Sequence, residues 1–309
     1  MRNAFADEIA QIARDDQRVV LLSGDIGNKL FEPFKSHSDA RFFNCGVAEA
    51  NMLGVAAGMA LSGLRPVVYT ITPFTTTRCY EQIRVDACYH RAPVLIVGTG
   101  AGLAYAELGP THHSCEDMAM LRLLPEMTVL APCDSVELRL LLRAALALDG
   151  PAYMRIGKRG EPVIHTQPPA LAIGRAITLR EGADMCMLST GNIMPVVLAA
   201  ADLLAARGFA ARVESFHTVK PLDTARLEEV FAGYPLVVVA EEHSRLGGLG
   251  GSIAEWLAAR TRSPRARLLA FGTDDAFMHE TGSQDYARRR FGLTAENIAH
   301  TVLARLAAG

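Results

Sequence analysis

A strand-to-helix junction near residue 49 places an acidic residue where ligands often bind in α/β proteins. The pattern predicts that a strand ends near Gly46 and that a helix begins close to Glu49. In an open α/β sheet, ligands bind beyond the carboxyl ends of the strands, so Glu49 would face such a crevice. A second explanation needs no ligand, because the helix dipole stabilises a carboxylate in a first turn by about 0.3–1 kcal/mol.

Two further segments carry side chains suited to binding or proton transfer. The loop of residues 98–116 contains the adjacent histidines His112 and His113, and loops of this length are more often functional than simple connections. A neutral imidazole suits proton transfer near pH 7, although a loop histidine can also serve only in hydrogen bonds. Phe74 and Arg78 follow a predicted strand, where a phenylalanine would ordinarily join the core.

The elements that must position these residues alternate between strands and helices. Short apolar runs closed by glycine or polar residues indicate buried strands, and longer segments with apolar residues at helical spacing indicate helices. Alternation of this kind predicts α/β domains with a mostly parallel sheet covered on both faces. The expected strands are residues 19–23, 66–72, 94–97, 128–131, 185–188, 211–216, 236–240 and 267–271, and the expected helices are 48–61, 76–90, 116–124, 135–148, 193–207 and 252–260.

A segment rich in glycine and proline interrupts this alternation. Residues 157–169 contain two glycines and three prolines and few core-forming residues, which is typical of a linker. We therefore expect two doubly wound α/β domains, residues 1–158 and 173–309, joined by a linker of residues 159–172.

Composition excludes several classes of protein. The chain has 309 residues, 50% of them hydrophobic, and a formal net charge of −2. Charges of one sign do not gather into a nucleic-acid-binding stripe, no apolar run approaches the ~18 residues of a membrane span, and the N-terminus does not resemble a signal peptide. The six cysteines lack C-x-x-C spacing, so we expect free thiols in a reducing cytoplasm and no metal ligands in this chain.

Two of the segments resemble a known enzyme family. Residues 41–52 read R-F-F-N-C-G-V-A-E-A-N-M, which resembles the opening of the pyrimidine-binding domain of transketolases, most of all the split form encoded as two chains. In that family the glutamate hydrogen-bonds the aminopyrimidine of thiamine diphosphate and promotes loss of the thiazolium proton, and Glu49 matches it. The resemblance also implies that Phe74, ahead of R-C-Y-E-Q-I-R, stacks on the aminopyrimidine. Arg78 would serve the cofactor pocket or a subunit interface.

The same resemblance gives roles to residues of the loops. G-P-T-H is a transketolase signature whose histidine faces the reacting carbons, and His112 matches it. His113 stands where the family often has glutamine and would meet substrate. Asp25 resembles an aspartate near the thiazolium ring, whereas Lys29 and Arg155 fall where the family binds the phosphate of the substrate.

Three positions of the same loop depart from the family. Transketolases carry a histidine that helps to bind the sugar phosphate where this chain has Gly100, and an aspartate that reads a substrate hydroxyl where it has Leu108. Deoxyxylulose-phosphate synthases place an arginine at the position of Ala101. A site that loses such hydrogen-bonding partners loses affinity for the standard sugar, which indicates a non-standard sugar substrate.

The second domain also resembles a transketolase, but one expected motif is absent. Residues 241–251 are similar to the E-E-H-x-x-x-G-G-L-G turn of the C-terminal domain, which is mainly structural. The family holds the diphosphate through Mg²⁺ with a G-D-G motif, and this chain has none. The resemblance therefore implies a partner subunit that carries the diphosphate domain and its Mg²⁺, in a heterotetramer with two copies of each chain.

The resemblance implies transfer of a two-carbon ketol unit between a ketose and an aldehyde. Two other enzymes with related domains stay open from the sequence: the beta chain of a 2-oxo acid dehydrogenase, and a deoxyxylulose-phosphate-synthase-like enzyme. A subunit that only stabilises a partner is a third alternative. The presence of Glu49, Phe74 and His112 argues against this last one.

Overall fold

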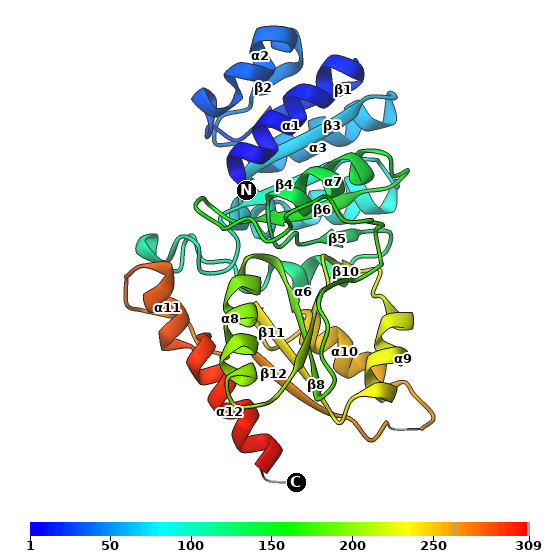
Figure 1. The fold of residues 1–309 in the computed structure, drawn as a ribbon. Coiled ribbons are helices and arrows are strands. Elements are labelled where there is room, and N and C mark those ends of the chain that lie inside the picture. Colours follow the sequence, from blue (N-terminus) through cyan, green and yellow to red (C-terminus); the bar gives the residue numbers. More distant parts are fainter. Residues whose placement is uncertain (263, 308–309) are drawn as a thin grey trace.

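A seven-stranded sheet forms the centre of the first domain in the computed structural model, which describes residues 1–262 and 264–307 (Figure 1). Its strands are β1 (Val19–Ser23), β2 (Phe42–Asn44), β3 (Arg65–Ile71), β4 (Leu95–Thr99), β5 (Thr128–Leu130), β6 (Ala152–Ile156) and β10 (Thr218–Lys220). They lie in the order β10-β5-β6-β4-β3-β1-β2. Neighbours pair in parallel except β10, which runs antiparallel to β5.

Helices cover both faces of this sheet. They are α1 (Arg2–Asp15), α2 (Glu32–Ser38), α3 (Glu49–Leu61), α4 (Thr72–Thr75), α5 (Tyr80–Gln82), α6 (Asp117–Arg122) and α7 (Ser135–Leu146). Successive strand residues point to opposite faces, so Leu21 packs in the apolar cluster with α1 and α7, whereas Leu22 packs in the cluster with α3 and α6. This two-sided burial confirms the predicted doubly wound arrangement.

The second domain repeats this arrangement around five strands. The strands are β7 (Ile177–Arg180), β8 (Met185–Thr190), β9 (Ala211–Ser215), β11 (Leu236–Ser244) and β12 (Arg267–Thr273), in the order β12-β11-β8-β9-β7, with β7 antiparallel to β9. The helices are α8 (Met194–Ala205), α9 (Thr224–Gly233), α10 (Leu249–Ala258), α11 (Gln284–Arg290) and α12 (Ala295–Ala307). Helices α8 and α12 pack on one face, and α9 and α10 on the other. Within the described residues, no helix is long and apolar enough to cross a membrane.

One strand crosses between the two halves of the sequence. Strand β10 follows β9 of the second domain along the chain but pairs with β5 at the edge of the first sheet. Residues 159–172, the predicted linker, form neither helix nor strand. The domains therefore share a continuous junction, where Figure 1 shows β5, β10 and α6 close to the second domain.

Two predicted helices differ in detail. The helix expected over residues 76–90 is divided into a 3₁₀ turn (Thr77–Cys79), α5 and a π-helical segment (Ile83–Tyr89). The hydroxyls of Thr75 and Thr76 both donate to the carbonyl of Thr72, and side chains that bond the local backbone compete with regular helix formation. The helix expected from residue 252 begins at Leu249, so part of the glycine run lies inside α10.

Candidate functional site

Glu49 lies at the first position of α3, as the sequence predicts. Strand β2 ends at Asn44, and a short loop with Gly46 in the left-handed region (φ +65°) leads into the helix. The Glu49 side chain is only 2% exposed. A buried carboxylate needs a hydrogen-bonding or charged partner, and this one finds it on another element.

Arg78 is that partner, and it also covers the ring of Phe74. Its Nη1 donates to Glu49 Oε1 at 3.0 Å. Its guanidinium carbon lies 4.3 Å from the centroid of the Phe74 ring, in α4. A planar cation over an aromatic face is attracted by the ring quadrupole. The structure thus brings together the three residues that the sequence assigns to a cofactor pocket.

His112 extends this cluster from the loop after β4. Its ring centroid lies 5.3 Å from that of Phe74 and 5.9 Å from that of Tyr105, edge-on in both cases. Its Nδ1 is 2.9 Å from the Thr111 hydroxyl. Partial burial lowers the pKa of His112 from its ordinary value, while the charge of Glu107 opposes this shift. A neutral imidazole near pH 7 follows from that direction.

Asp25 connects to the same region through a polar chain. Asn44 Nδ2 donates to Asp25 Oδ1 at 2.9 Å, and the backbone N–H of Gly46 donates to Asn44 Oδ1 at 3.0 Å. Asp25 itself adopts a left-handed backbone (φ 54°), which is uncommon for a residue with a side chain. These bonds join the end of β1 to the loop that precedes Glu49. Lys29 is exposed in the turn after β1, and its phosphate contact stays a prediction.

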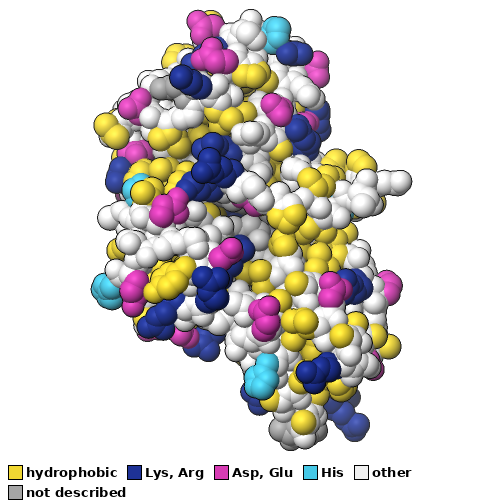
Figure 2. All heavy atoms as spheres, turned by 60° about the vertical axis from the view of Figure 1, so that its left-hand side comes forward, with side chains coloured by type: hydrophobic (Ala, Val, Ile, Leu, Met, Phe, Trp, Pro, Cys, Tyr) yellow, Lys and Arg dark blue, Asp and Glu magenta, His cyan; other side chains and the backbone are white. Residues whose placement is uncertain are grey.

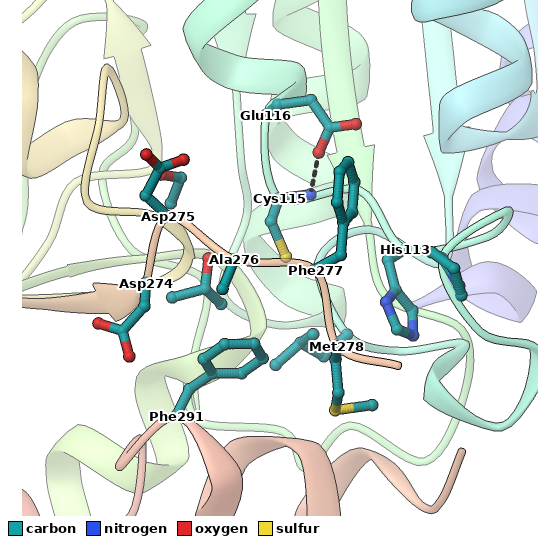
Figure 3. A pocket seen from close by; sticks show the side chains of 13 residues that line it. His113, Cys115, Glu116, Asp274, Asp275, Ala276, Phe277, Met278 and Phe291 are labelled. Atoms are coloured by element: carbon teal, nitrogen blue, oxygen red, sulfur yellow. Dashed lines mark hydrogen bonds between the residues drawn. The ribbon is translucent and has the colours of Figure 1, made fainter. Parts of the chain in front are cut away.

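His113 points to a different place from His112. It lines a cavity of about 360 Å³ between the G-P-T-H loop and the segment of residues 274–278 that follows β12 (Figure 3). Burial lowers its pKa, and its Nε2 is buried without a hydrogen-bond partner among the described residues. The other lining residues that Figure 3 labels are Cys115, Glu116, Asp274, Asp275, Ala276, Phe277, Met278 and Phe291.

The second-domain wall of this cavity was not predicted from the sequence. Phe277 is 78% exposed, and its segment carries no motif that would have indicated a site. Figure 2 shows hydrophobic side chains on this side of the molecule at the level where the two domains meet. The exposure of Phe277 is visible only in the structure, so the sequence offered no signal for this wall.

Arg155 does not offer its charge to a ligand in this structure. Its side chain is 4% exposed, and its Nε lies 3.0 Å from Asp117 Oδ2. The guanidinium also donates to the carbonyls of Ser114 and Glu242. These contacts satisfy the buried charge, which needs a partner of its own, and the phosphate contact expected from the resemblance stays a prediction.

Gly100 leaves room for an aromatic ring. Its backbone has φ +75°, and a Cβ there would lie 1.9 Å from the Tyr105 ring. The Tyr105 ring thus occupies the space that a side chain at position 100 would need, and Lys158 Nζ lies 4.5 Å from the centroid of the same ring. Sequence reasoning missed Tyr105 because no motif marks it.

The glycine-rich turn of the second domain binds its own carboxylate. Glu241 accepts from the N–H groups of Leu249 and Gly250 at 2.8 and 2.9 Å, at the start of α10. A Cβ at Gly248 would lie 2.1 Å from Glu241 Oε2, so glycine is needed there. The next residue, Glu242, accepts from the N–H of Leu103 in the first domain at 2.8 Å. These contacts give the turn a structural role, as predicted.

Comparisons with known proteins agree with this geometry. The model of the transketolase pyrimidine-binding domain matches residues 1–161, and that of the transketolase C-terminal domain matches residues 174–298. The 6-deoxy-6-sulfo-D-fructose transketolase subunit SqwH of Clostridium sp. (strain MSTE9) is 37% identical, over 99% of this chain and 95% of the relative. A subunit of the apulose-4-phosphate transketolase of Phocaeicola vulgatus is 31% identical, over 98% and 96%.

A solved structure shows the same fold over nearly the whole chain. It is described as a split gene transketolase, inactive beta4 tetramer, and it superposes with a TM-score of 0.88 at 33% identity over 98% of this chain and 96% of that one. The relatives and this structure span the same two domains and little more. The chain therefore belongs to the transketolase family, as a split subunit made of the pyrimidine-binding and C-terminal domains.

Proposed function

We propose that this chain activates thiamine diphosphate in a split transketolase that transfers a two-carbon ketol unit from a ketose to an aldehyde. One observation carries this proposal. The buried carboxylate of Glu49 accepts an N–H from the planar guanidinium of Arg78, which lies over the ring of Phe74. The aminopyrimidine of the cofactor is likewise planar and rich in nitrogen, so these residues fit it. When bound, the cofactor supplies the nucleophilic carbon that breaks and forms C–C bonds.

Each residue of the cluster then has a defined task. Glu49 would hold a ring nitrogen of the aminopyrimidine, and Phe74 would take one face of that ring. Arg78 would belong to this pocket, where it contacts both Glu49 and Phe74. His112, neutral near pH 7, would accept or return a proton at a substrate oxygen. Asp25 would lie beside the thiazolium ring.

A partner subunit would complete the site. The chain lacks a G-D-G motif, and Mg²⁺ requires oxygen ligands that bridge protein and diphosphate. We propose that the partner holds both, in a heterotetramer. Two apolar side chains near Glu49 support a covered surface there, since Val47 is 83% exposed and Phe43 is 42% exposed.

The substrate would be a non-standard sugar. Gly100, Ala101 and Leu108 stand where related enzymes carry polar residues, and the Tyr105 ring fills the space beside Gly100. A surface of this kind favours a sugar with fewer hydroxyls, or with a different anionic group, at the end that these residues meet. The two relatives named for a sulfofructose and for apulose-4-phosphate act on such sugars by their names. His113 and Lys29 would contribute polar contacts to it.

A cytoplasmic location completes the proposal. All six cysteines are free thiols in the structure. Thiols persist in a reducing compartment, whereas disulfides are favoured outside it. Retention of the protein in a cytosolic fraction is the corresponding measurement.

The test is reconstitution with a chain that carries the diphosphate domain. Calorimetry should show tight Mg²⁺-dependent binding of thiamine diphosphate by the mixture and none by this chain alone. Ketol transfer should then be assayed with ordinary ketose phosphates, 6-deoxy-6-sulfofructose and apulose 4-phosphate as donors.

One variant isolates the central residue. Glu49→Gln should lower the rate by at least about 100-fold, the scale of a lost acid–base group. Glu81→Gln, an exposed residue of α5, should not change it. Full activity of the Glu49 variant, or tight binding of the cofactor by the lone chain, would contradict the proposed function.

A further inference from the structure

A second cluster of polar side chains lies away from the Glu49 site, where the linker crosses α7. Cys133 precedes the helix, Glu137 lies in its first turn, and His165 comes from the linker. One sulfur, one carboxylate oxygen and one imidazole nitrogen from these residues all lie within 4.8 Å of one another. The cluster could not be seen in the sequence, because no two cysteines or histidines there have metal-ligand spacing.

The histidine of this cluster is oriented by a carboxylate. Its Nδ1 lies 3.2 Å from Asp134 Oδ2, which also accepts from the backbone N–H of His165 at 2.9 Å. This contact fixes the ring and leaves Nε2 on the side of Glu137 and Cys133. Histidines that bind metals almost always donate their other ring N–H to a carboxylate or carbonyl in this way.

Two buried atoms of the cluster have no hydrogen-bond partner among the residues that the structure describes. Glu137 is fully buried and its Oε1 has none, and neither has His165 Nε2, whose side chain is 7% exposed. The two atoms are 3.7 Å apart, which is too long for a hydrogen bond. Leaving buried polar atoms unpaired is costly, so their joint orientation points to a group that binds both.

An ion pair between His165 and Glu137 explains this arrangement less well. It would use only two of the three side chains, and the 3.7 Å separation of their nearest atoms exceeds a hydrogen bond. A tetrahedral zinc ion holds its sulfur, nitrogen and oxygen ligands about 3.4–3.6 Å from one another. The separation of Nε2 and Oε1 is already close to that value, and a rotation of the short cysteine side chain can shorten the longest separation.

We propose that Cys133, Glu137 and His165 bind one divalent transition-metal ion, with zinc as the preferred ion. Sulfur, imidazole and carboxylate together suit a cation of intermediate softness rather than Mg²⁺ or Ca²⁺. Asp134 orients the histidine. The buried Ser215 hydroxyl at the end of β9 lies beside Cys133 and Glu137 and would be next to the ion. This proposal differs from the expectation, drawn from the sequence, that the chain holds no metal ligands.

The position of this ion gives it a structural role. Cys133 and Glu137 belong to the first domain, His165 to the linker and Ser215 to the second domain. Cys133 and the linker residue Ile164 also pack in the apolar cluster of the second domain. An ion here would hold the linker against both domains and fix their relative orientation. It would be independent of the proposed ketol transfer and of the Mg²⁺ assigned to the partner.

Cobalt is the most direct probe, because its bond to a thiolate produces a charge-transfer band in the near ultraviolet. The full chain is stripped with a chelator and titrated with Co²⁺, and then with Zn²⁺ as a competitor. We expect saturation at one equivalent, a thiolate band that Zn²⁺ abolishes, and a higher melting temperature with the metal. Metal analysis of the untreated protein should find about one zinc per chain.

Variants assign the ligands. Cys133→Ser should remove the thiolate band, and His165→Gln should weaken Co²⁺ binding at least about tenfold. Cys45→Ser and His90→Gln, which change a thiol and an imidazole elsewhere in the first domain, should change neither. Where a variant fails to fold, the Co²⁺ titration of the wild-type chain still tests the proposal. No thiolate band at saturating Co²⁺, or an unchanged band in Cys133→Ser, would overturn the proposal.

Discussion

Arg78 donates a hydrogen bond to the buried carboxylate of Glu49 at 3.0 Å while its guanidinium lies over the ring of Phe74. The two side chains differ in burial, since that of Glu49 is 2% exposed and that of Arg78 is 49% exposed. The arginine is therefore the partner that can move. One side chain of the same subunit contacts both surfaces assigned to the aminopyrimidine, so Arg78 and the cofactor would compete for them.

Arg78→Ala should therefore tighten the binding of thiamine diphosphate in the reconstituted complex. The variant loses a half-exposed ion pair and a cation–π contact, together about 1 kcal/mol, that would compete with the cofactor for Glu49 and Phe74. We expect an affinity about fivefold higher, measured by calorimetry with Mg²⁺ present.

The neighbouring arginine provides a control for this experiment. Arg84 pairs with Glu81 on the next turn, and both side chains are exposed. Arg84→Ala should leave the affinity unchanged. Weaker binding by the Arg78 variant would show that this arginine contacts the bound cofactor instead of competing with it.

The burial of Arg155 predicts a loss of stability rather than of substrate affinity. Arg155→Ala would leave Asp117 buried and without its ion-pair partner, which typically costs about 3–5 kcal/mol. Urea unfolding of the isolated chain measures this cost. The expectation is a large fall in the free energy of unfolding.

Replacing both Arg155 and Asp117 tests the same ion pair, because stability should then be regained. The double variant Asp117→Asn, Arg155→Met leaves no unpaired charge, so it should regain much of the lost stability. A stable Arg155→Ala chain with a raised KM for the sugar would instead support the phosphate contact that the family resemblance implies.

Glu242 should prove essential for the junction of the two domains. Its carboxylate accepts from the Leu103 N–H of the first domain and from Gln284 and Arg288 of the second. Glu242→Ala leaves Arg288 without this partner and should cost about 3–5 kcal/mol. Faster hydrogen exchange in residues 100–116 should accompany it.

An exposed glutamate of the second domain is the comparison for Glu242. Glu255 pairs with Arg122 across the domains, but its side chain is largely exposed. Glu255→Ala should cost less than about 1 kcal/mol. Equal losses in the two variants would mean that burial does not set the strength of these contacts.

The local pattern of the sequence was sufficient for the elements that carry the cofactor cluster. Strand β2 ends and α3 begins where the apolar pattern changed, which places Glu49 at the predicted junction. Phe74 follows β3 for the same reason. These positions depend on short-range periodicity and on the general rule that sites form at the carboxyl ends of parallel strands.

Contacts between distant segments could not be predicted in the same way. The sequence alone indicates an unpaired Arg155 near a strand end, whereas the structure shows that it pairs with Asp117. Strand β10 has only three residues and joins the sheet of the other domain. The meeting of Cys133 with His165 depends on the path of a linker without regular structure. In each case the deciding partner comes from another element, and one sequence does not say which elements meet.

The acid limb of the pH–rate profile should reflect the protonation of His112. Burial disfavours its imidazolium form and lowers its pKa from the ordinary value of 6.5. Lowering the pKa keeps the neutral form present to lower pH, so kcat/KM should fall only below about pH 6.5. Glu107 stabilises the charged form, since its charge raises this pKa. Glu107→Gln should therefore move the acid limb to still lower pH.

His113 must be separated from His112, because burial lowers the pKa of both. His113→Gln should keep the acid limb where it is in the wild-type complex, since this ring lines the cavity beside residues 274–278 and not the cluster around Glu49. His112→Asn should reduce kcat/KM at least about 100-fold, as expected for a lost proton-transfer group. If the limb disappears in the His113 variant and persists in the His112 variant, then His113 is the group that exchanges a proton with the substrate.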